Sequence, residues 1–165
     1  MLIILGGLPG VGKTTIGREL CRQIGALHLR IDSIEQALRA RAIRKVPMDD
    51  AGYLVGYAIA EDNLRLGRAV VADSVNPLAV TRDAWRAVGK RAQVNALEIE
   101  ITCSDSREHR GRVETRRSDI AGLTLPTWQE VIDREYQPWD GERLVIDTAH
   151  MPVAESVRMI RRALG

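Results

Sequence analysis

The residues with the strongest chemical pattern lie near the start of the chain, where Gly7-Leu8-Pro9-Gly10-Val11-Gly12-Lys13-Thr14 matches the spacing G-x-x-x-x-G-K-[ST] at every position. Glycines here let backbone N–H groups turn inward around a phosphate, because a Cβ atom would restrict both the dihedral angles and the approach. A helix that begins near Lys13 would point its positive end at the same phosphate. The alternative is a chance glycine-rich turn, which the apolar run before the motif and the helical pattern after it disfavour.

This Walker A pattern predicts a nucleoside triphosphate site. Lys13 would reach the β- and γ-phosphates, and the Thr14 hydroxyl would bind Mg²⁺. We therefore expect ATP and Mg²⁺ as cofactors and count Lys13 among the catalytic residues. The predicted nucleotide-binding residues are Gly7, Leu8, Pro9, Gly10, Val11, Gly12, Lys13, Thr14 and Thr15.

Two aspartates follow apolar runs and are candidates for the rest of the site. Asp73 ends the run Val70-Val71-Ala72, which places an acid at a strand end where it can join the Mg²⁺ shell. Asp32 follows a second strand pattern and could accept a proton from an incoming hydroxyl group during phosphoryl transfer. Either carboxylate could instead cap a turn or a helix. Ser74 and Asn76 would lie at the same rim or simply form the turn.

An arginine cluster follows the fourth strand pattern. Its members are Arg107, Arg110, Arg112, Arg116 and Arg117. At about 100° per helical residue, Arg112 and Arg116 share one face, with His109 beside them. Such a charge run is usually a solvated helix face. Phosphoryl transfer, however, needs cations at the transferring group, and planar guanidinium groups suit that role.

Strand and helix patterns alternate along the chain, which predicts an α/β fold with a parallel sheet and ligands at the carboxyl ends of its strands. At 165 residues, we expect one domain over 1–165, with 107–138 as a mobile lid. The predicted strands are 2–5, 27–31, 69–73, 94–102 and 144–146. The predicted helices are 13–24, 35–43, 51–66, 81–89, 105–117, 127–136 and 153–164.

Composition narrows the possible partners. A net charge of +2 and six aromatic residues (Trp 3, Tyr 3, Phe 0) disfavour nucleic acid without excluding it. Arg30, Arg39, Arg41, Arg44 and Lys45 could meet phosphates, although a solvated helix face explains them more simply. No apolar run is long enough for a membrane span, and no signal peptide is visible, so we expect a cytoplasmic protein. The oligomeric state does not follow from the sequence.

Together these residues resemble the small P-loop kinases. The resemblance covers most of the chain and rests on Gly7–Thr15, Asp32, the Asp73-Ser74-Val75-Asn76-Pro77 stretch with Thr81–Trp85, and the spacing of Arg112 and Arg116. The group includes polynucleotide 5′-hydroxyl kinase, zeta toxins, chloramphenicol phosphotransferase, and the gluconate and shikimate kinases. The most similar pattern belongs to the branch near the polynucleotide kinase domain that is labelled ATP-binding protein or AAA-family ATPase.

The resemblance implies a three-layer P-loop fold, with a five-stranded sheet in the order 2-3-1-4-5 and a mobile lid. It implies that Asp32 is the general base and that Arg112 and Arg116 are lid arginines that touch ATP and the transferred phosphate. It places the adenine near Thr148 and Ala149. One departure concerns the acceptor, because the polynucleotide kinase pattern D-x-x-R has Glu35 in place of its arginine here.

We therefore expect an ATP- and Mg²⁺-dependent phosphotransferase that acts on a hydroxyl group of an unidentified small molecule. The catalytic residues would be Lys13, Asp32, Arg112 and Arg116, with Arg112 also binding the nucleotide and with Thr14 and Asp73 holding the metal. The alternatives are a nucleotide-binding regulatory ATPase or switch, and a polynucleotide 5′-hydroxyl kinase or toxin-type kinase.

Overall fold

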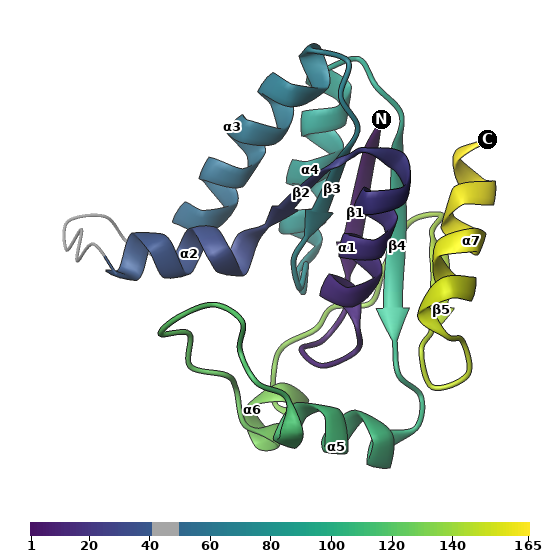
Figure 1. Ribbon diagram of the computed structural model, residues 1–165. Coiled ribbons are helices and arrows are strands. Elements are labelled where there is room, and N and C mark those ends of the chain that lie inside the picture. The colour runs from purple at the N-terminus through teal and green to yellow at the C-terminus, as the bar shows by residue number, and fades with distance from the viewer. Residues whose placement is uncertain (41–49) are drawn as a thin grey trace.

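The computed structural model describes residues 1–40 and 50–165, in which strands and helices alternate as predicted (Figure 1). The strands are β1 (Leu2–Gly6), β2 (Leu27–Arg30), β3 (Val70–Asp73), β4 (Ala96–Thr102) and β5 (Leu144–Asp147). The helices are α1 (Lys13–Ile24), α2 (Ile31–Ala40), α3 (Ala51–Arg65), α4 (Ala79–Arg91), α5 (Ser106–Thr115), α6 (Trp128–Ile132) and α7 (Val153–Leu164). Within these residues, no helix combines the length and the apolar character needed to cross a membrane.

The five strands form a parallel sheet in the order β2-β3-β1-β4-β5, which confirms the predicted order. The central strand β1 is fully buried from Leu2 to Leu5, as expected for a parallel strand covered on both faces. Its register pairs Leu5 with Asp73 of β3. The carboxyl ends of β1, β2 and β3 therefore meet at one edge of the sheet.

Helices cover both faces of the sheet. On one face, Ile16 of α1 and Val157 of α7 pack into a core with Ile3 and Leu5. On the other face, Trp85 of α4 packs in a second core together with Ala60 and Leu64 of α3. The helices α5 and α6 lie beyond the carboxyl edge of the sheet, toward which β4 points (Figure 1). They fall in the segment 107–138 that the sequence predicts to be a lid, and we use that name for the segment below. The loop after β1 thus lies between the sheet and the lid.

The start of α2 differs from the prediction. Strand β2 ends at Arg30, and the helix begins at Ile31 with no intervening loop, so Asp32 lies in the first helical turn. The predicted strand end at Ile31 and the capping roles of Asp32 and Ser33 are therefore wrong. An acid in the first turn is stabilised by the positive end of the helix. The predicted end of this helix at residue 43 lies outside the described residues. Pro47, which is expected to break the helical pattern, and Asp49, expected at the start of the next helix, also lie outside them.

The lid helices are shorter than predicted. Asp105 caps α5 by accepting hydrogen bonds from the backbone N–H groups of Arg107 and Glu108, at 2.9 and 3.1 Å. The backbone of Arg116 is extended, with ψ of 147°, which ends the helix before the predicted residue 117. Thr127 precedes α6 and forms a capping box with Glu130, but this helix stops at Ile132 rather than near residue 136.

Two smaller differences lie between β3 and β4. Helix α4 runs from Ala79 to Arg91 rather than over 81–89. Strand β4 starts at Ala96 instead of residue 94, because Gln93 adopts a left-handed conformation with φ of 56° and forms a turn.

A fully buried arginine joins the lid to the sheet edge. The guanidinium group of Arg82 in α4 donates to the carbonyl oxygens of Asn76, Gln137 and Pro138, at 3.2, 3.3 and 2.8 Å. It also lies 5.0 Å from the ring centroid of Trp139. Arg82 therefore holds the chain that returns from the lid against the turn after β3.

Candidate functional site

The loop between β1 and α1 has the conformation that phosphate binding requires. Gly7, Gly10 and Gly12 have φ values of 140°, 89° and 102°, a region that side chains rarely adopt. A Cβ atom at Gly7 would lie 2.1 Å from the carbonyl oxygen of Ile101. The loop leads directly into the N-terminus of α1 at Lys13, so its N–H groups and the helix dipole favour the same anion.

Lys13 is buried inside this loop. Its ammonium group donates to the carbonyl oxygen of Leu8 at 2.9 Å, and only 8% of the residue is exposed. Burial lowers the pKa of Lys13 to about 8, while the charges of Asp73 and Asp32 act in the opposite direction. Both predicted aspartates therefore act on this lysine, which sits where bound phosphate groups would lie.

Asp73 lies at the end of β3 and is only 3% exposed. Burial acts to raise its pKa, but His28, Lys13 and the Thr14 hydroxyl outweigh burial and hold the pKa below its usual value. The carboxylate is therefore ionised at neutral pH with the Thr14 hydroxyl close by. An acid and a hydroxyl beside a phosphate-binding loop fit Mg²⁺, which takes few protein ligands and completes its shell with phosphate and water.

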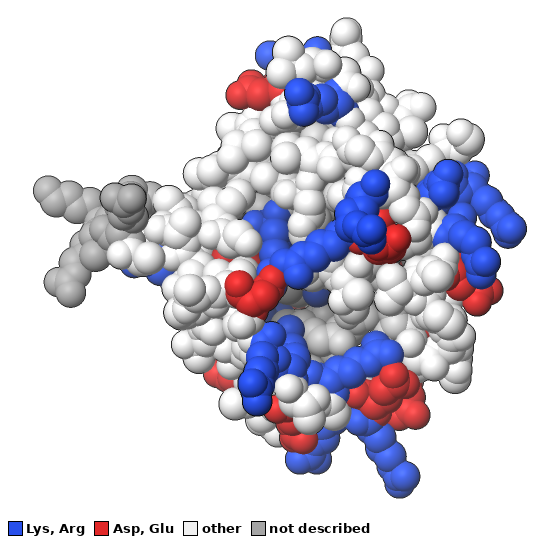
Figure 2. All heavy atoms as spheres, in the orientation of Figure 1, with Lys and Arg blue, Asp and Glu red and all other residues white. Residues whose placement is uncertain are grey.

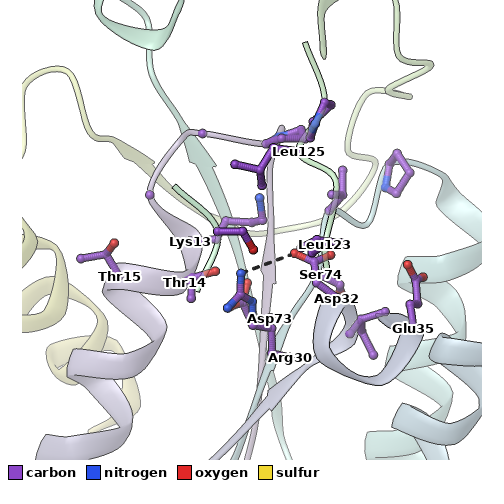
Figure 3. A pocket seen from close by; sticks show the side chains of 18 of the residues that line it. Lys13, Thr14, Thr15, Arg30, Asp32, Glu35, Asp73, Ser74, Leu123 and Leu125 are labelled. Carbon is purple, nitrogen blue, oxygen red and sulfur yellow. Dashed lines mark ion pairs between the residues drawn. The ribbon is translucent and has the colours of Figure 1, made fainter. Parts of the chain in front are cut away.

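Asp32 opens into the same cavity. Figure 3 shows Lys13 and Thr14 on one side, Asp32 and Glu35 on the other, and Asp73 and Arg30 between them. About half of the Asp32 side chain is exposed (49%), and its Oδ2 lies 3.8 Å from Nη2 of Arg30. Asp32 is thus open to an incoming ligand, with a guanidinium group at its side.

The two lid arginines point to different parts of the site. Arg112 donates to the hydroxyl and the carbonyl oxygens of Thr148, at 2.7 and 3.0 Å. The Thr148 hydroxyl also lies 2.9 Å from the carbonyl oxygen of Val11 in the loop. Arg116 directly follows the end of α5. Burial lowers its pKa, and the nearby charges of Asp32 and Arg30 act to raise and to lower it, respectively. The predicted shared helical face is therefore wrong, because α5 ends between the two arginines.

His109 does not lie beside the arginines in the cavity. It is buried, with Nε2 2.8 Å from the carbonyl oxygen of Pro9 and its ring edge-to-face with Trp128. Val113, one turn further along α5, comes so close to the loop that a Cβ atom at Gly10 would lie 2.6 Å from its Cγ2. Both contacts seat the lid helix directly on the phosphate-binding loop.

One large cavity joins these groups. Its volume is about 1730 Å³, well above the roughly 300–1,000 Å³ of a site for one small ligand. Its lining includes Lys13, Asp32, Asp73, Arg112, Arg116 and Thr148. The structure thus brings all the predicted catalytic and metal-binding side chains to one cavity with room for a nucleotide and a second ligand. Within the described part of the chain, no cluster of three or more His, Cys, Asp and Glu residues forms a separate metal site.

Several polar side chains of this cavity were not singled out from the sequence. Arg18 and Asp119 line it, as does Arg134, whose charge acts on Lys13. Arg30 was considered only for nucleic acid, yet it lines the cavity. Arg39 lines it too and pairs with Glu35 at 3.1 Å. Arg41, Arg44 and Lys45 lie outside the described residues. The signal for Arg30 was available, because alternate residues of a strand share a face and Arg30 ends β2.

Asn76 and Ser74 occupy the rim of the sheet after β3. Asn76 has a left-handed backbone with φ of 49°, and its side-chain N–H donates to the carbonyl oxygen of Leu5 at 2.8 Å. Of the two roles considered for Asn76, a group at the rim of the site or a residue that forms the turn, these contacts favour the turn. Ser74 is buried next to Asp73 and lines the cavity.

Comparisons with known proteins agree on the type of fold. A family model described as an AAA domain matches residues 2–135. Shikimate kinase from Bordetella pertussis is 27% identical over 172 residues, which cover 96% of this chain and 75% of that protein. A Mycobacterium tuberculosis APS kinase in complex with AMPPNP and APS aligns with a TM-score of 0.76 at 19% identity, over 99% of this chain and 96% of that one. Kti12 from Chaetomium thermophilum in complex with ADP-AlF3 aligns with a TM-score of 0.73 at 19% identity, over 100% of both chains.

Proposed function

This chain belongs to the AAA-domain family that matches its residues 2–135, and we propose that it is a Mg²⁺-dependent phosphotransferase that moves the γ-phosphate of ATP to a hydroxyl group of a small molecule. The observation that carries this proposal is the position of Asp32. A partly exposed carboxylate faces the same cavity as the phosphate-binding lysine, and the cavity has room for two ligands. A protein that only binds a nucleotide has no need of an acid on the acceptor side.

The donor half of the site would hold ATP on the loop from Gly7 to Thr15. The inward-turned backbone and Lys13 would bind the β- and γ-phosphates. Thr14 and Asp73 would hold Mg²⁺, which when bound would neutralise part of the phosphate charge. Arg112 would bind the nucleotide at the turn that contains Thr148, where the lid helix and the loop already meet.

The acceptor half would lie between Asp32 and the lid. Asp32 would take the proton of the acceptor hydroxyl as its oxygen forms a bond to the γ-phosphorus and the bond to the leaving ADP breaks. Arg116 would neutralise the charge that spreads over the transferring group. Residues 107–138 would act as the lid that excludes water.

Glu35 supports a small acceptor over a polynucleotide. It lines the acceptor side of the cavity, and burial raises its pKa, with Arg39 acting in the opposite direction. Its carboxylate pairs with Arg39 at 3.1 Å, so this position offers no cation for the phosphate groups of a nucleic acid chain. A small acceptor does not need such a cation.

The test is the variant Asp32→Asn, assayed with labelled ATP and a panel of hydroxyl compounds. We expect unchanged ATP affinity and turnover lowered by about 10²–10⁴-fold, because the hydroxyl loses its proton acceptor. Ser33→Ala, which alters the exposed neighbour on the same helical turn, is the matched control and should leave turnover unchanged. Full turnover in Asp32→Asn would remove the base role. ATP binding without transfer to any compound would favour a nucleotide-binding switch.

A further inference from the structure

Asp119, in the loop between α5 and α6, contacts two arginines across the cavity, one in α1 and one at the end of β2. The Asp119 carboxylate accepts a hydrogen bond from Nη1 of Arg30 at 2.8 Å and pairs with Arg18 of α1. These two guanidinium groups hold the pKa of Asp119 far below its usual range. The contacts join segments about a hundred positions apart in sequence, so only the folded chain assembles them.

Arg30 is not an ordinary surface cation. Its side chain is 13% exposed at the end of β2, and its Nε is buried with no hydrogen-bond partner in the described part of the chain. Buried polar groups are normally hydrogen-bonded, and guanidinium groups bind carboxylates and phosphates through two N–H groups at once. Arg30 therefore retains donor capacity that its present partners leave unused.

The charges around Arg30 do not balance. The cavity that Arg30 lines carries more basic than acidic side chains, eight against six among the described residues that line it. Figure 2 shows basic side chains, with acidic ones between them, around the hollow in the face that it presents. An excess of positive charge in a half-open cavity attracts an anionic ligand.

We propose that Arg18 and Arg30 form the subsite for an anionic group of the acceptor, and that Asp119 occupies this subsite as an internal carboxylate until the acceptor displaces it. The inference rests on the proposed function and names its substrate class, a hydroxy compound that carries a carboxylate or a phosphate ester. Because Nη2 of Arg30 lies 3.8 Å from Asp32, an anion on Arg30 places the hydroxyl group of the same small molecule beside the base.

Displacement also explains how the lid could sense the acceptor. The loop that carries Asp119 also carries Leu123 and Leu125, which line the cavity (Figure 3). When the acceptor anion takes the place of the Asp119 carboxylate, this loop loses its two ionic contacts with α1 and β2. Acceptor binding and lid position are thereby coupled through one pair of arginines.

The test measures anion binding without turnover. The 165-residue chain is saturated with Mg²⁺ and ADP, so that the phosphate-binding loop is filled, and is titrated by calorimetry with malonate, inorganic phosphate or uncharged glycerol. We expect wild type to bind malonate or phosphate weakly. Asp119→Asn should bind that anion about tenfold more tightly, because the competing internal carboxylate is gone. Preference for malonate or for phosphate would identify the anionic group.

Three variants complete the design. Arg30→Gln and the exposed Arg18→Gln, which leaves the core intact, should each weaken anion binding at least tenfold. Asp62→Asn removes one carboxylate from the exposed surface of α3 and should bind the anion as wild type does. The proposal is overturned if Asp119→Asn binds no more tightly than Asp62→Asn, or if neither arginine variant weakens binding.

Because no phosphate is transferred in this assay, its outcome does not depend on the result of the Asp32→Asn turnover test. Anion binding at Arg30 without any kinase activity would refute the proposed function alone. Kinase activity with no effect of Asp119 or Arg30 on anion binding would refute this inference alone.

Discussion

The side chains of His28 and Asp73 meet on the α1 side of the sheet, with Nε2 of His28 3.1 Å from Oδ2 of Asp73. They come from neighbouring parallel strands in which His28 pairs with Val71, so the ring reaches along the sheet to the acid. A Cβ atom at Gly17 of α1 would lie 3.3 Å from the same Nε2, so the helix holds the ring in place. His28 thus orients the carboxylate that we assign to the metal.

The first prediction follows from this contact. His28→Ala should raise the Mg²⁺ concentration that half-saturates ATP binding by roughly tenfold or more. Groups that orient a metal ligand typically contribute about 10–100-fold in metal affinity. Titration of Mg²⁺ at fixed ATP, followed by calorimetry, measures the change. His150→Ala, at an exposed histidine, is the control. An unchanged Mg²⁺ midpoint in His28→Ala would show that Asp73 needs no such partner.

The second prediction separates the two lid arginines. Arg112 contacts the turn at Thr148, so Arg112→Ala should weaken ATP binding with a smaller effect on the rate of transfer. Arg116 lies on the Asp32 side, so Arg116→Ala should lower turnover by about 10²–10³-fold at nearly unchanged ATP affinity. ATP binding and turnover of both variants provide the comparison.

Arg110, which is exposed on the same helix and pairs with Glu114, offers the matched control Arg110→Ala. It should leave both quantities unchanged. If Arg112→Ala and Arg116→Ala shift ATP affinity and turnover in the same proportion, the two arginines do not have separate roles.

The third prediction concerns pH and Asp119. Its pKa is lower in the folded protein, so its pairing with Arg30 and Arg18 contributes stability above the unfolded pKa of about 3.9, and that stability is lost as the pH falls toward the folded value. Since these pairs are partly exposed, Asp119→Asn should lower the free energy of unfolding by about 1 kcal/mol at pH 7. Urea unfolding from pH 7 to pH 3 should show a constant difference down to about pH 5 that then shrinks. A difference that grows in acid would contradict this assignment.

The fourth prediction concerns Arg82. Arg82→Met should lower the free energy of unfolding by about 3 kcal/mol, because it leaves the carbonyl oxygens of Asn76, Gln137 and Pro138 without their donor. Urea denaturation measures the loss. Arg158→Met on the exposed side of α7 should change stability by less than about 0.5 kcal/mol. Equal stabilities for the two variants would mean that Arg82 does not hold the lid to the sheet edge.

Much of the donor side could be predicted from the sequence, because its signals are local. The glycines before Lys13 specify a loop that few other residues could form, and the family match confirms the predicted resemblance to the small P-loop kinases. The buried runs of β1 and β3 likewise specify a parallel sheet, and with it the edge at which Asp73 lies. The positions where helices end were harder to predict. The predicted shared face of Arg112 and Arg116 was wrong because α5 ends at Thr115, before Arg116.

The sequence by itself determined the phosphate-binding loop, the alternation of strands and helices, and the types of residue that phosphoryl transfer requires, since each depends on neighbours a few positions apart. Only the tertiary structure decided that His28 supports Asp73 and that Asp119 pairs with Arg18 and Arg30. These contacts join residues from separate strands, helices and loops. Their geometry arises only when the sheet brings its carboxyl ends together and the loop that carries Asp119 folds back against that edge.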